Sequence, residues 1–473
     1  MVTTQPKMAW AIMVLLMMQA LVIASAESFD FLGDNVDDIE RFCYPENYKN
    51  TRQSCECSNE SSPPWGLRVV NVDCSFKNLK TKDFSEMLPL YVDSLDLTWN
   101  TLERVPALAS DTLRLLNLMH NNISLILSKN FINIGNLQEL YLSWNSIQSI
   151  EANAFDGLGY LQVLDLSHNN LHQLAFQIFA PLKTLESLSM SWNRGLNQTE
   201  GIQELDFYQT FGVNVKLRSL KLEACNLGNI SLPQQVPLKE LDLRRNLFTE
   251  VPGHLPSTLE KIDLSENLMV TFSENDTKHL KQIHELYMED MPRLQTIEEN
   301  SFVPLQSLEK ISFQNSRGLS HIHGHAFGEN STRPPHLHTI VFRGTGLHTF
   351  NSTLSPVFFQ LSSLDLQGVQ LHCNCKLVWL KDLALETNGR CFKPSRLRGI
   401  TLTSANSNDF SCERWPRWVY GIIILALIVL CSVGIYFIVM GLRPHGGVTM
   451  RRKVGAGSPY ARVTIEPNRQ EHY

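Results

Sequence analysis

One eleven-residue frame that recurs along the chain constrains the fold more than any other feature. Residues 137–147 read Leu-x-x-Leu-x-Leu-x-x-Asn-x-Ile, and residues 161–171 repeat the frame 24 residues later with a final Leu. Twelve copies fit it, some degenerate, and they begin at Val92, Leu113, Leu137, Leu161, Leu185, Leu217, Leu238, Leu259, Ile283, Leu308, Leu337 and Leu361. This period predicts a solenoid in which each copy adds one turn and packs against its neighbours.

Each copy contains a Leu-x-Leu segment that predicts a short strand, with both leucines pointing inward and the residues beside them outward. The chain turns away at the ninth position, where an Asn side chain can bond backbone groups that the turn leaves unpaired. These ladder residues are Asn100, Asn121, Asn145, Asn169, Asn193, Cys225, Asn246, Asn267, Met291, Ser316, Thr345 and Val369. Cys225 is expected to be a buried structural thiol, since no His or Lys flanks it to activate it.

Two groups of four cysteines flank the copies, and Cys225 and Cys431 are left over. The groups are Cys43, Cys55, Cys57 and Cys74 near the start, and Cys373, Cys375, Cys391 and Cys412 after the last copy. Even numbers favour disulfides in an oxidising compartment. Zinc is the alternative for a Cys-x-Cys pair, although structural zinc pairs usually leave two or more residues between the sulfurs.

Together with the repeated frame, two motifs resemble the caps of the extracellular leucine-rich-repeat family. Residues 371–380, which read Leu-His-Cys-Asn-Cys-Lys-Leu-x-Trp-Leu, resemble its C-terminal cap, and Val72-Asp73-Cys74 resembles its N-terminal cap. The resemblance covers residues 43–412 and implies an α/β solenoid, a horseshoe of about twelve repeats with a parallel β-sheet on its concave side. It also implies the bridges Cys43–Cys57, Cys55–Cys74, Cys373–Cys391 and Cys375–Cys412, whereas spacing alone permits three pairings per group.

Apolar segments lie at both ends of the chain. Residues 8–24 lead to Ala24-Ser25-Ala26, so we expect a signal peptide cleaved after Ala26, with an uncleaved anchor as the alternative. Residues 419–442 carry no charge and predict a transmembrane helix, with aromatic residues before it and basic residues after it. The sequence thus predicts a type I plasma-membrane protein, with residues 27–417 outside the cell.

The expected organisation is a signal peptide (1–26), an N-terminal cysteine cap (27–91), leucine-rich repeats (92–371), a C-terminal cysteine cap and stalk (372–418), a transmembrane helix (419–442) and a cytoplasmic tail (443–473). Seven Asn-x-Ser/Thr sequons lie between the apolar ends and are expected to carry glycans. They are Asn59, Asn122, Asn197, Asn229, Asn275, Asn330 and Asn351.

Recognition of a partner is expected on the concave surface, where two sets of residues are candidates. Just before the ladder residue, the first five copies alternate Trp and His, at Trp99, His120, Trp144, His168 and Trp192. A column of this kind suits either an aromatic strip that binds a protein partner or rings that stack along the edge to shield it.

In copies six to nine the outward positions become charged and partly acidic. Arg244 and Arg245 are the binding candidates there, and the set could steer a basic partner or be an ordinary solvated face. The set is Lys221, Glu223, Glu240, Asp242, Arg244, Arg245, Lys261, Asp263, Glu266, Glu285, Glu289 and Asp290.

Other chemistry is weakly indicated. His321, His323 and His325 alternate and could bind a metal, but an inward Ile322 between them favours simple exposure. No hydrolase, phosphate-loop, zinc-protease or dinucleotide motif occurs, so we expect neither an enzyme nor a cofactor. The 41 basic and 47 acidic residues also argue against a nucleic-acid binder.

The tail of 31 residues is too short for a signalling domain and offers only linear motifs. Tyr460 and Val463 form a Tyr-x-x-apolar unit that resembles a sorting signal or a phosphotyrosine motif. Glu471 and the terminal Tyr473 resemble a ligand of PDZ grooves. Adaptors that read such motifs are therefore expected partners.

The sequence favours a cell-surface recognition or adhesion receptor that binds an extracellular protein, homophilically or heterophilically, through the concave face. The alternative is an auxiliary subunit that modulates a channel or signalling receptor in the same membrane.

Overall fold

The computed structural model describes most of the repeats and one helix after them. The described residues are 55–61, 68–84, 88–89, 91–172, 174–196, 204–206, 216–329, 331–383, 385, 387–410, 412 and 417–441. The chain divides into two compact units, Met1–Cys412 and Glu413–Tyr473. The first unit contains the repeats and the second contains the helix.

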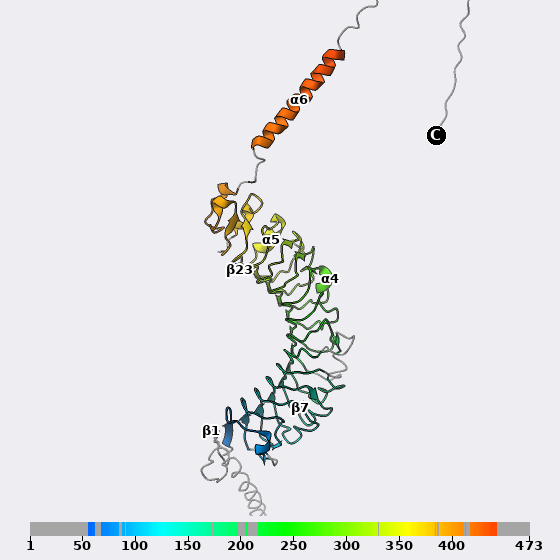
Figure 1. Cartoon of the computed structure of the whole chain (residues 1–473), viewed down its shortest axis with the longest axis vertical. Coiled ribbons are helices and arrows are strands. Elements are labelled where there is room, and N and C mark those ends of the chain that lie inside the picture. Colours follow the sequence, from blue (N-terminus) through cyan, green and yellow to red (C-terminus); the bar gives the residue numbers. More distant parts are fainter. Residues whose placement is uncertain are drawn as a thin grey trace, which may run out of the picture. The chain divides into compact units, whose positions relative to one another are not determined.

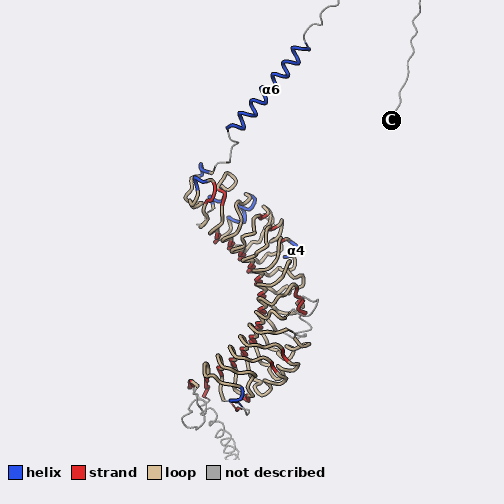
Figure 2. Tube along the Cα trace, in the orientation of Figure 1, coloured by secondary structure: helices blue, strands red, loops and turns tan. Residues whose placement is uncertain are grey.

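One sheet runs through the whole repeat unit and begins in the N-terminal cap. There β1 (Glu56–Ser61) pairs antiparallel with β2 (Arg68–Asp73), and β2 pairs parallel with the first strand of the repeats. Twelve parallel strands follow: β4 (Ser94–Asp96), β6 (Leu115–Asn117), β8 (Glu139–Tyr141), β10 (Val163–Asp165), β11 (Ser187–Ser189), β13 (Ser219–Lys221), β15 (Glu240–Asp242), β16 (Lys261–Asp263), β18 (Glu285–Tyr287), β20 (Lys310–Ser312), β22 (Thr339–Val341) and β23 (Ser363–Asp365). Figure 2 shows these strands along the inner side of the arc that the repeats form.

All twelve copies of the frame supply a strand, so the predicted parallel sheet of twelve repeats is confirmed. The central residue of each strand is buried, and except at Ser312 in β20 its two neighbours are less so. In β8, for example, Leu140 points inward between Glu139 and Tyr141. The pairing register joins equivalent positions, and Leu140 faces Leu164 of the next copy. The leucine period therefore sets the register.

The outer side of the repeats consists mainly of turns and two-residue strands. The outer strands include β3 (Leu88–Pro89) with β5 (Leu108–Ala109), β7 (Leu125–Ile126) with β9 (Ser149–Ile150), β12 (Glu204–Asp206) with β14 (Asn229–Ser231), and β17 (Thr271–Phe272) with β19 (Thr296–Ile297) and β21 (His321–Ile322). The described repeats contain two α-helices of four residues each, α4 (Glu274–Thr277) and α5 (Ser355–Phe358) (Figure 1). The protein is a β-solenoid with little helix, because most copies leave too few residues beyond the strand and its turns for a longer helix.

Buried side chains fill the space between the inner and outer strands. The inward leucines of the frame are almost fully buried, and each contributes about 1.5–3 kcal/mol of burial free energy. Phenylalanines behind them stack from copy to copy. Phe155 lies between Phe131 and Phe179, with ring centroids 6.1 Å and 5.8 Å apart. The core is thus one continuous column that extends along the solenoid.

The ladder asparagines bond the backbone as predicted. Nδ2 of Asn145 donates to the carbonyls of Leu118 at 2.9 Å and of Leu142 at 3.1 Å, and its Oδ1 accepts from the amide of Ile123 at 3.0 Å. In the sixth copy, Cys225 is buried and its Sγ lies 3.2 Å from the carbonyl oxygen of Met190, in donor geometry. Burial raises the pKa of this thiol to about 12, which keeps it protonated and able to donate.

Disulfides close both ends of the repeat unit. The structure pairs Cys55 with Cys74, Cys373 with Cys391, and Cys375 with Cys412, which are pairings that the family resemblance implied. Cys57 is also disulfide-bonded, and its expected partner Cys43 lies outside the described residues.

The C-terminal cap adds short elements around its bridges. They are β24 (Leu371–His372), β25 (Cys391–Lys393), η4 (Val378–Asp382), η5 (Ser395–Leu397) and η6 (Ser407–Asp409). Two further 3-10 turns lie earlier, η2 (Thr81–Phe84) and η3 (Ser352–Leu354). The cap covers the last turn of the core, since Leu377 and Leu380 are buried against it.

The second unit contains the helix α6 (Arg417–Gly441). Its segment Trp418–Ile438 is long and apolar enough to cross a membrane, and none of that segment is buried inside the protein. At about 1.5 Å per residue the helix is roughly 37 Å long, which exceeds a hydrocarbon core of about 30 Å. It begins two residues before the predicted span, whose last residue, Leu442, lies outside the described residues.

Candidate recognition surface

Thirteen residues in a single row adopt the left-handed backbone conformation where successive strands end. We call this row the edge column: Phe76, Trp99, His120, Trp144, His168, Trp192, Ala224, Arg245, Glu266, Asp290, Asn315, Gly344 and Gly368. Their φ angles lie between 50° and 78°. Such angles are uncommon for residues other than Gly, Asn, Asp and His, so the turn imposes them on the Phe, Trp and Arg residues of the row.

Acidic and amide side chains at the ends of the strands fix this turn. Oδ1 of Asp165 accepts from the amide of Ser167 at 2.9 Å, and Oδ1 of Asp242 accepts from the amide of Arg244 at 3.0 Å. The same bond, from the backbone amide two residues later to the side-chain Oδ1, is made to five other residues: Asp73, Asp96, Asn117, Asp263 and Asp365. These residues are therefore structural parts of the recognition surface, and their signal in the sequence is an Asp or Asn between the two inward apolar residues of the strand.

The first six members of the edge column form a continuous stack of rings, which we call the aromatic stack. Its neighbouring planes lie within 17° of parallel. The closest centroids are those of Trp99 and His120, at 3.8 Å, and of Trp144 and His168, at 3.9 Å. The sequence prediction started this column at Trp99, and the structure adds Phe76 from the N-terminal cap at 5.5 Å.

Two arginines cover the end of the aromatic stack. The guanidinium carbons of Arg194 and Arg245 lie 5.2 Å and 5.3 Å from the ring centroid of Trp192. Arg245 reaches back across the small Ala224, which occupies the column position between them. The stack therefore continues into the charged copies through a cation–π contact.

Stacking covers the ring faces but leaves ring edges open. Phe76 is 71% exposed, Trp99 51% and Trp144 49%. In the described part of the chain, the indole nitrogens of the stacked tryptophans donate no hydrogen bond to protein. Burial lowers the pKa of His168 below its ordinary value, so this ring is mainly neutral at pH 7.

The ring geometry bears on the two interpretations of the column. The rings stack along the edge, as the shielding interpretation requires, and they lie in the turns after the strands rather than on the strands. The exposed ring edges leave the binding interpretation open as a proposal.

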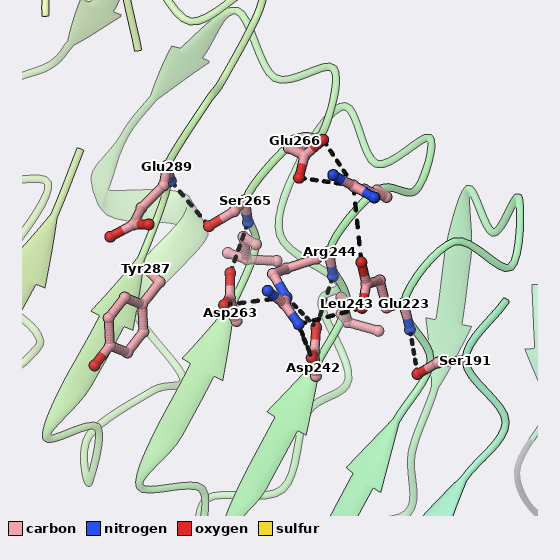
Figure 3. A network of polar contacts seen from close by, with 12 residues as sticks. Ser191, Glu223, Asp242, Leu243, Arg244, Asp263, Ser265, Glu266, Tyr287 and Glu289 are labelled. Atoms are coloured by element: carbon pink, nitrogen blue, oxygen red, sulfur yellow. Dashed lines mark hydrogen bonds and ion pairs between the residues drawn. The ribbon is translucent and has the colours of Figure 1, made fainter. Parts of the chain in front are cut away.

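The charged copies form a network centred on Arg244 (Figure 3). The guanidinium lies 3.1 Å from Asp242, 3.2 Å from Glu223 and 3.5 Å from Asp263. Burial raises the pKa of the Asp263 carboxyl to about 6, against the opposing effect of Arg244. Three carboxylates around one guanidinium give this patch an excess of negative charge above pH 6.

The second candidate arginine, Arg245, is also bound within the protein. Its Nε lies 2.8 Å from Glu266 and 3.7 Å from Glu223. Both arginines are therefore already paired with carboxylates of the protein. A partner that binds here would contact the arginines and these carboxylates together.

Further along the surface, lysines and Tyr287 continue the network. Lys261 pairs with Glu240 at 3.0 Å and lies 5.8 Å from the centroid of the Tyr287 ring. Lys310 bonds the Tyr287 hydroxyl at 3.0 Å. The strand face of copies six to ten is thus a set of cross-strand pairs, which are partly exposed and can exchange partners at low cost.

The alternating histidines do not converge. The rings of His323 and His325 lie 5.9 Å apart at a tilt, and His321 is exposed in β21. Among the residues that the structure describes, no group of three or more metal-ligating side chains is found.

Four of the seven sequons have described and exposed asparagine side chains, at Asn122, Asn229, Asn275 and Asn351. Asn229 lies in β14, Asn275 lies in α4 and Asn351 precedes η3, all away from the inner strands. The backbone of Asn59 lies in β1. Asn197, Asn330 and the tail residues Tyr460, Val463, Glu471 and Tyr473 lie outside the described residues.

Two family models match parts of the repeat unit. Residues 135–194 match a family described as leucine rich repeat, and residues 219–343 and 278–411 match the BspA type leucine rich repeat region. The human chondroadherin-like protein is 38% identical over 82 residues, which cover 16% of this chain and 10% of that protein. The crystal structure of the leucine-rich repeat domain of APL1B aligns with a TM-score of 0.43 and 16% identity, over 64% of this chain and 76% of that chain.

The matches to these two family models identify residues 135–194 and 219–411 as leucine-rich repeats. Solenoids of this class generally serve as scaffolds for protein–protein interaction, because stacked repeats present a long surface whose outward side chains vary from copy to copy.

Proposed function

We propose that this chain is a cell-surface recognition or adhesion protein that binds an extracellular protein through the inner side of its repeats. The observation that carries the proposal is the unbroken parallel sheet, which presents the outward residues of twelve successive strands on one surface. With strands about 4.8 Å apart, that surface is roughly 50 Å long, which is the scale of a protein partner rather than of a small ligand.

The chemistry of this surface supports a macromolecular partner. One half of it is bordered by exposed aromatic edges in the turns, and the other half carries partly exposed ion pairs around Arg244 and Lys261. Aromatic and arginine side chains are enriched where protein interfaces gain most of their affinity. Surplus carboxylates such as Glu289 and Asp290 would attract a basic partner over a distance of about 8–10 Å at physiological salt.

We further infer a single-pass type I topology in the plasma membrane, with the repeats outside. The disulfides at both ends of the repeats suit an oxidising compartment, and the apolar α6 suits a membrane span. Sequons at Asn229, Asn275 and Asn351 lie away from the inner strands, so glycans there would leave the sheet accessible.

Three measurements on the full chain test this proposal. An epitope tag placed after residue 26 should be stained on intact cells, and glycosidase treatment should lower the apparent mass. Cells that display the chain should then bind members of a panel of soluble extracellular proteins, and binding should fall when Lys261 and Tyr287 are both changed to Ala.

A tag that stains only after permeabilisation, or a chain without glycans, would refute the topology. Surface display without binding to the panel, combined with co-purification of a channel or receptor from the same membrane, would favour an auxiliary role instead.

A further inference from the structure

The edge column has equal numbers of residues on the two sides of its middle member, and the side chains on one side could bind those on the other. Ala224 has six column residues on each side. The N-terminal six are rings, several of which carry N–H groups. Of the C-terminal six, Arg245 is a donor bound to Glu266, the next three offer oxygen acceptors and the last two lack a side chain. These five are Glu266, Asp290, Asn315, Gly344 and Gly368.

We propose that a second copy of this chain binds antiparallel along the edge column, with a twofold axis through Ala224. A twofold axis brings the same patch of the two copies together in reverse order. A residue that lies a given number of positions before Ala224 in one copy therefore meets the residue the same number of positions after Ala224 in the second copy. Adjacent strands repeat at about 4.8 Å in both halves, which lets the register hold along the column.

The resulting pairs match in polarity. His168 of one copy meets Glu266 of the second copy, and Trp144 meets Asp290 of the second copy. His120 likewise meets Asn315. Each pair places ring N–H groups opposite a side-chain oxygen, and charge-assisted bonds to carboxylates are the stronger kind.

The outer pairs match in size. Trp99 meets Gly344 of the second copy and Phe76 meets Gly368 of the second copy, so the two most exposed rings of the stack lie over positions that lack a side chain. Both glycines are accessible, and Phe76 and Trp99 are more than half exposed. A parallel pairing would instead set ring on ring and Glu266 on Glu266, which is unfavourable in both size and charge.

Asp290 gives the clearest electrostatic reason for a partner. It is exposed, and within the described part of the chain it makes no ion pair. Its neighbour in the column, Glu266, is bound to Arg245 at 2.8 Å. The acceptor half of the column thus has unused capacity, which an indole or imidazole N–H from a second copy would fill.

The size of this surface predicts weak pairing. A row roughly 60 Å long and one side chain wide covers on the order of 600 Å² per copy, which is at the low end for specific interfaces. Many copies displayed on a membrane would compensate through avidity. In an antiparallel pair the two C-terminal caps lie at opposite ends, and α6 begins five residues after Cys412. If the topology proposed above holds, the pair would join two facing membranes.

Cysteine trapping tests the pairing in the full chain, purified in detergent. Every chain carries Cys431→Ser and Asn122→Gln, so that neither the exposed thiol nor a glycan beside His120 interferes. One population carries Trp144→Cys and a second, differently tagged, carries Asp290→Cys. Under mild oxidation the mixture should give a disulfide-linked dimer with both tags, whereas each population alone should give no disulfide-linked dimer.

A second pair, His168→Cys mixed with Glu266→Cys, keeps the test independent of Trp144. Glu250→Cys, an exposed site outside the column, replaces Asp290→Cys as the matched control and should give no mixed dimer. Absence of a mixed dimer from both column pairs, or a dimer of Trp144→Cys with itself, would overturn the antiparallel arrangement.

Aggregation of cells that display the chain tests whether the pairing also occurs between cells. Asp290→Lys should weaken aggregation of cells that display the full chain about tenfold, and Glu250→Lys, with the same change of charge, should leave it intact. Equal aggregation by both variants would contradict the proposal. If the tag does not reach the cell surface, the topology fails, while trapping in detergent still decides the pairing.

Discussion

Asn246 offers the sharpest test of how the ladder stabilises the solenoid. Its side chain is 3% exposed and makes five hydrogen bonds to backbone. Nδ2 donates to the carbonyl of Leu222 at 2.8 Å and to two carbonyls of its own copy at 3.0 Å. Oδ1 accepts from the amides of Cys225 at 3.1 Å and Leu227 at 3.0 Å.

The cost of Asn246→Ala follows from the groups left behind. Two buried amides lose their acceptor, and a buried unsatisfied group costs about 1–3 kcal/mol. Partial access of water lowers the total, so we expect a loss of about 3 kcal/mol, or a factor of about a hundred in the local opening equilibrium. Asn246→Asp keeps the acceptor but places a carboxylate against three carbonyl oxygens. Its damage should therefore decrease at acid pH, where the carboxyl is protonated and can donate.

Hydrogen exchange of the full chain measures this effect locally, which is appropriate because repeat proteins need not unfold in two states. The amides of Cys225 and Leu227 should exchange about a hundredfold faster in Asn246→Ala, while amides of distant copies keep their rates. A change smaller than about tenfold would refute the reasoning, because it would mean that water satisfies these groups.

Three further predictions follow from single residues. Trp144→Ser, which breaks two ring contacts, should lower stability by about 1–3 kcal/mol in chemical denaturation without changing exchange in copies eight to twelve. The folded pKa of Asp263, about 6, lies above the unfolded value of 3.8, so its contribution to stability is full below about pH 4 and is lost as pH rises through 6. Asp263→Asn should accordingly raise the thermal midpoint at pH 7 and not at pH 4, in a pH series. Cys225, with a pKa of about 12 and no exposure, should resist alkylation at pH 8 until the chain is denatured, as mass spectrometry would show.

The sequence determined the inner half of each copy because burial is periodic there. Leu140 and Leu142 must both point inward for the strand to pack, and the Asn at position 145 then has a single place in the turn. The outer half carried no comparable period, so its two-residue strands and short helices were not predictable. They depend on how neighbouring copies fit together rather than on residue type.

The sequence predicted which residues lie on the candidate surface, but it did not predict their backbone conformation or their contacts with one another. Trp144 is not a residue that favours positive φ, and only the two His residues of the column, Asp290, Asn315 and the two glycines indicated that this position is left-handed. The pairing of Arg244 with three carboxylates was equally hidden, since those residues come from three separate copies.

The change of chemistry along the edge column is possible because each copy contacts only its neighbours. The aromatic stack extends while every copy supplies a ring, and it ends at Ala224, in the copy whose ladder residue is Cys225. Arg245 then bridges the gap, since its side chain can cover Trp192 and still bond Glu266. One small residue therefore divides a single structural row into a ring half and an acceptor half. That division is the property on which reversed pairing of two copies depends, because a uniform row would pair equally well in any register.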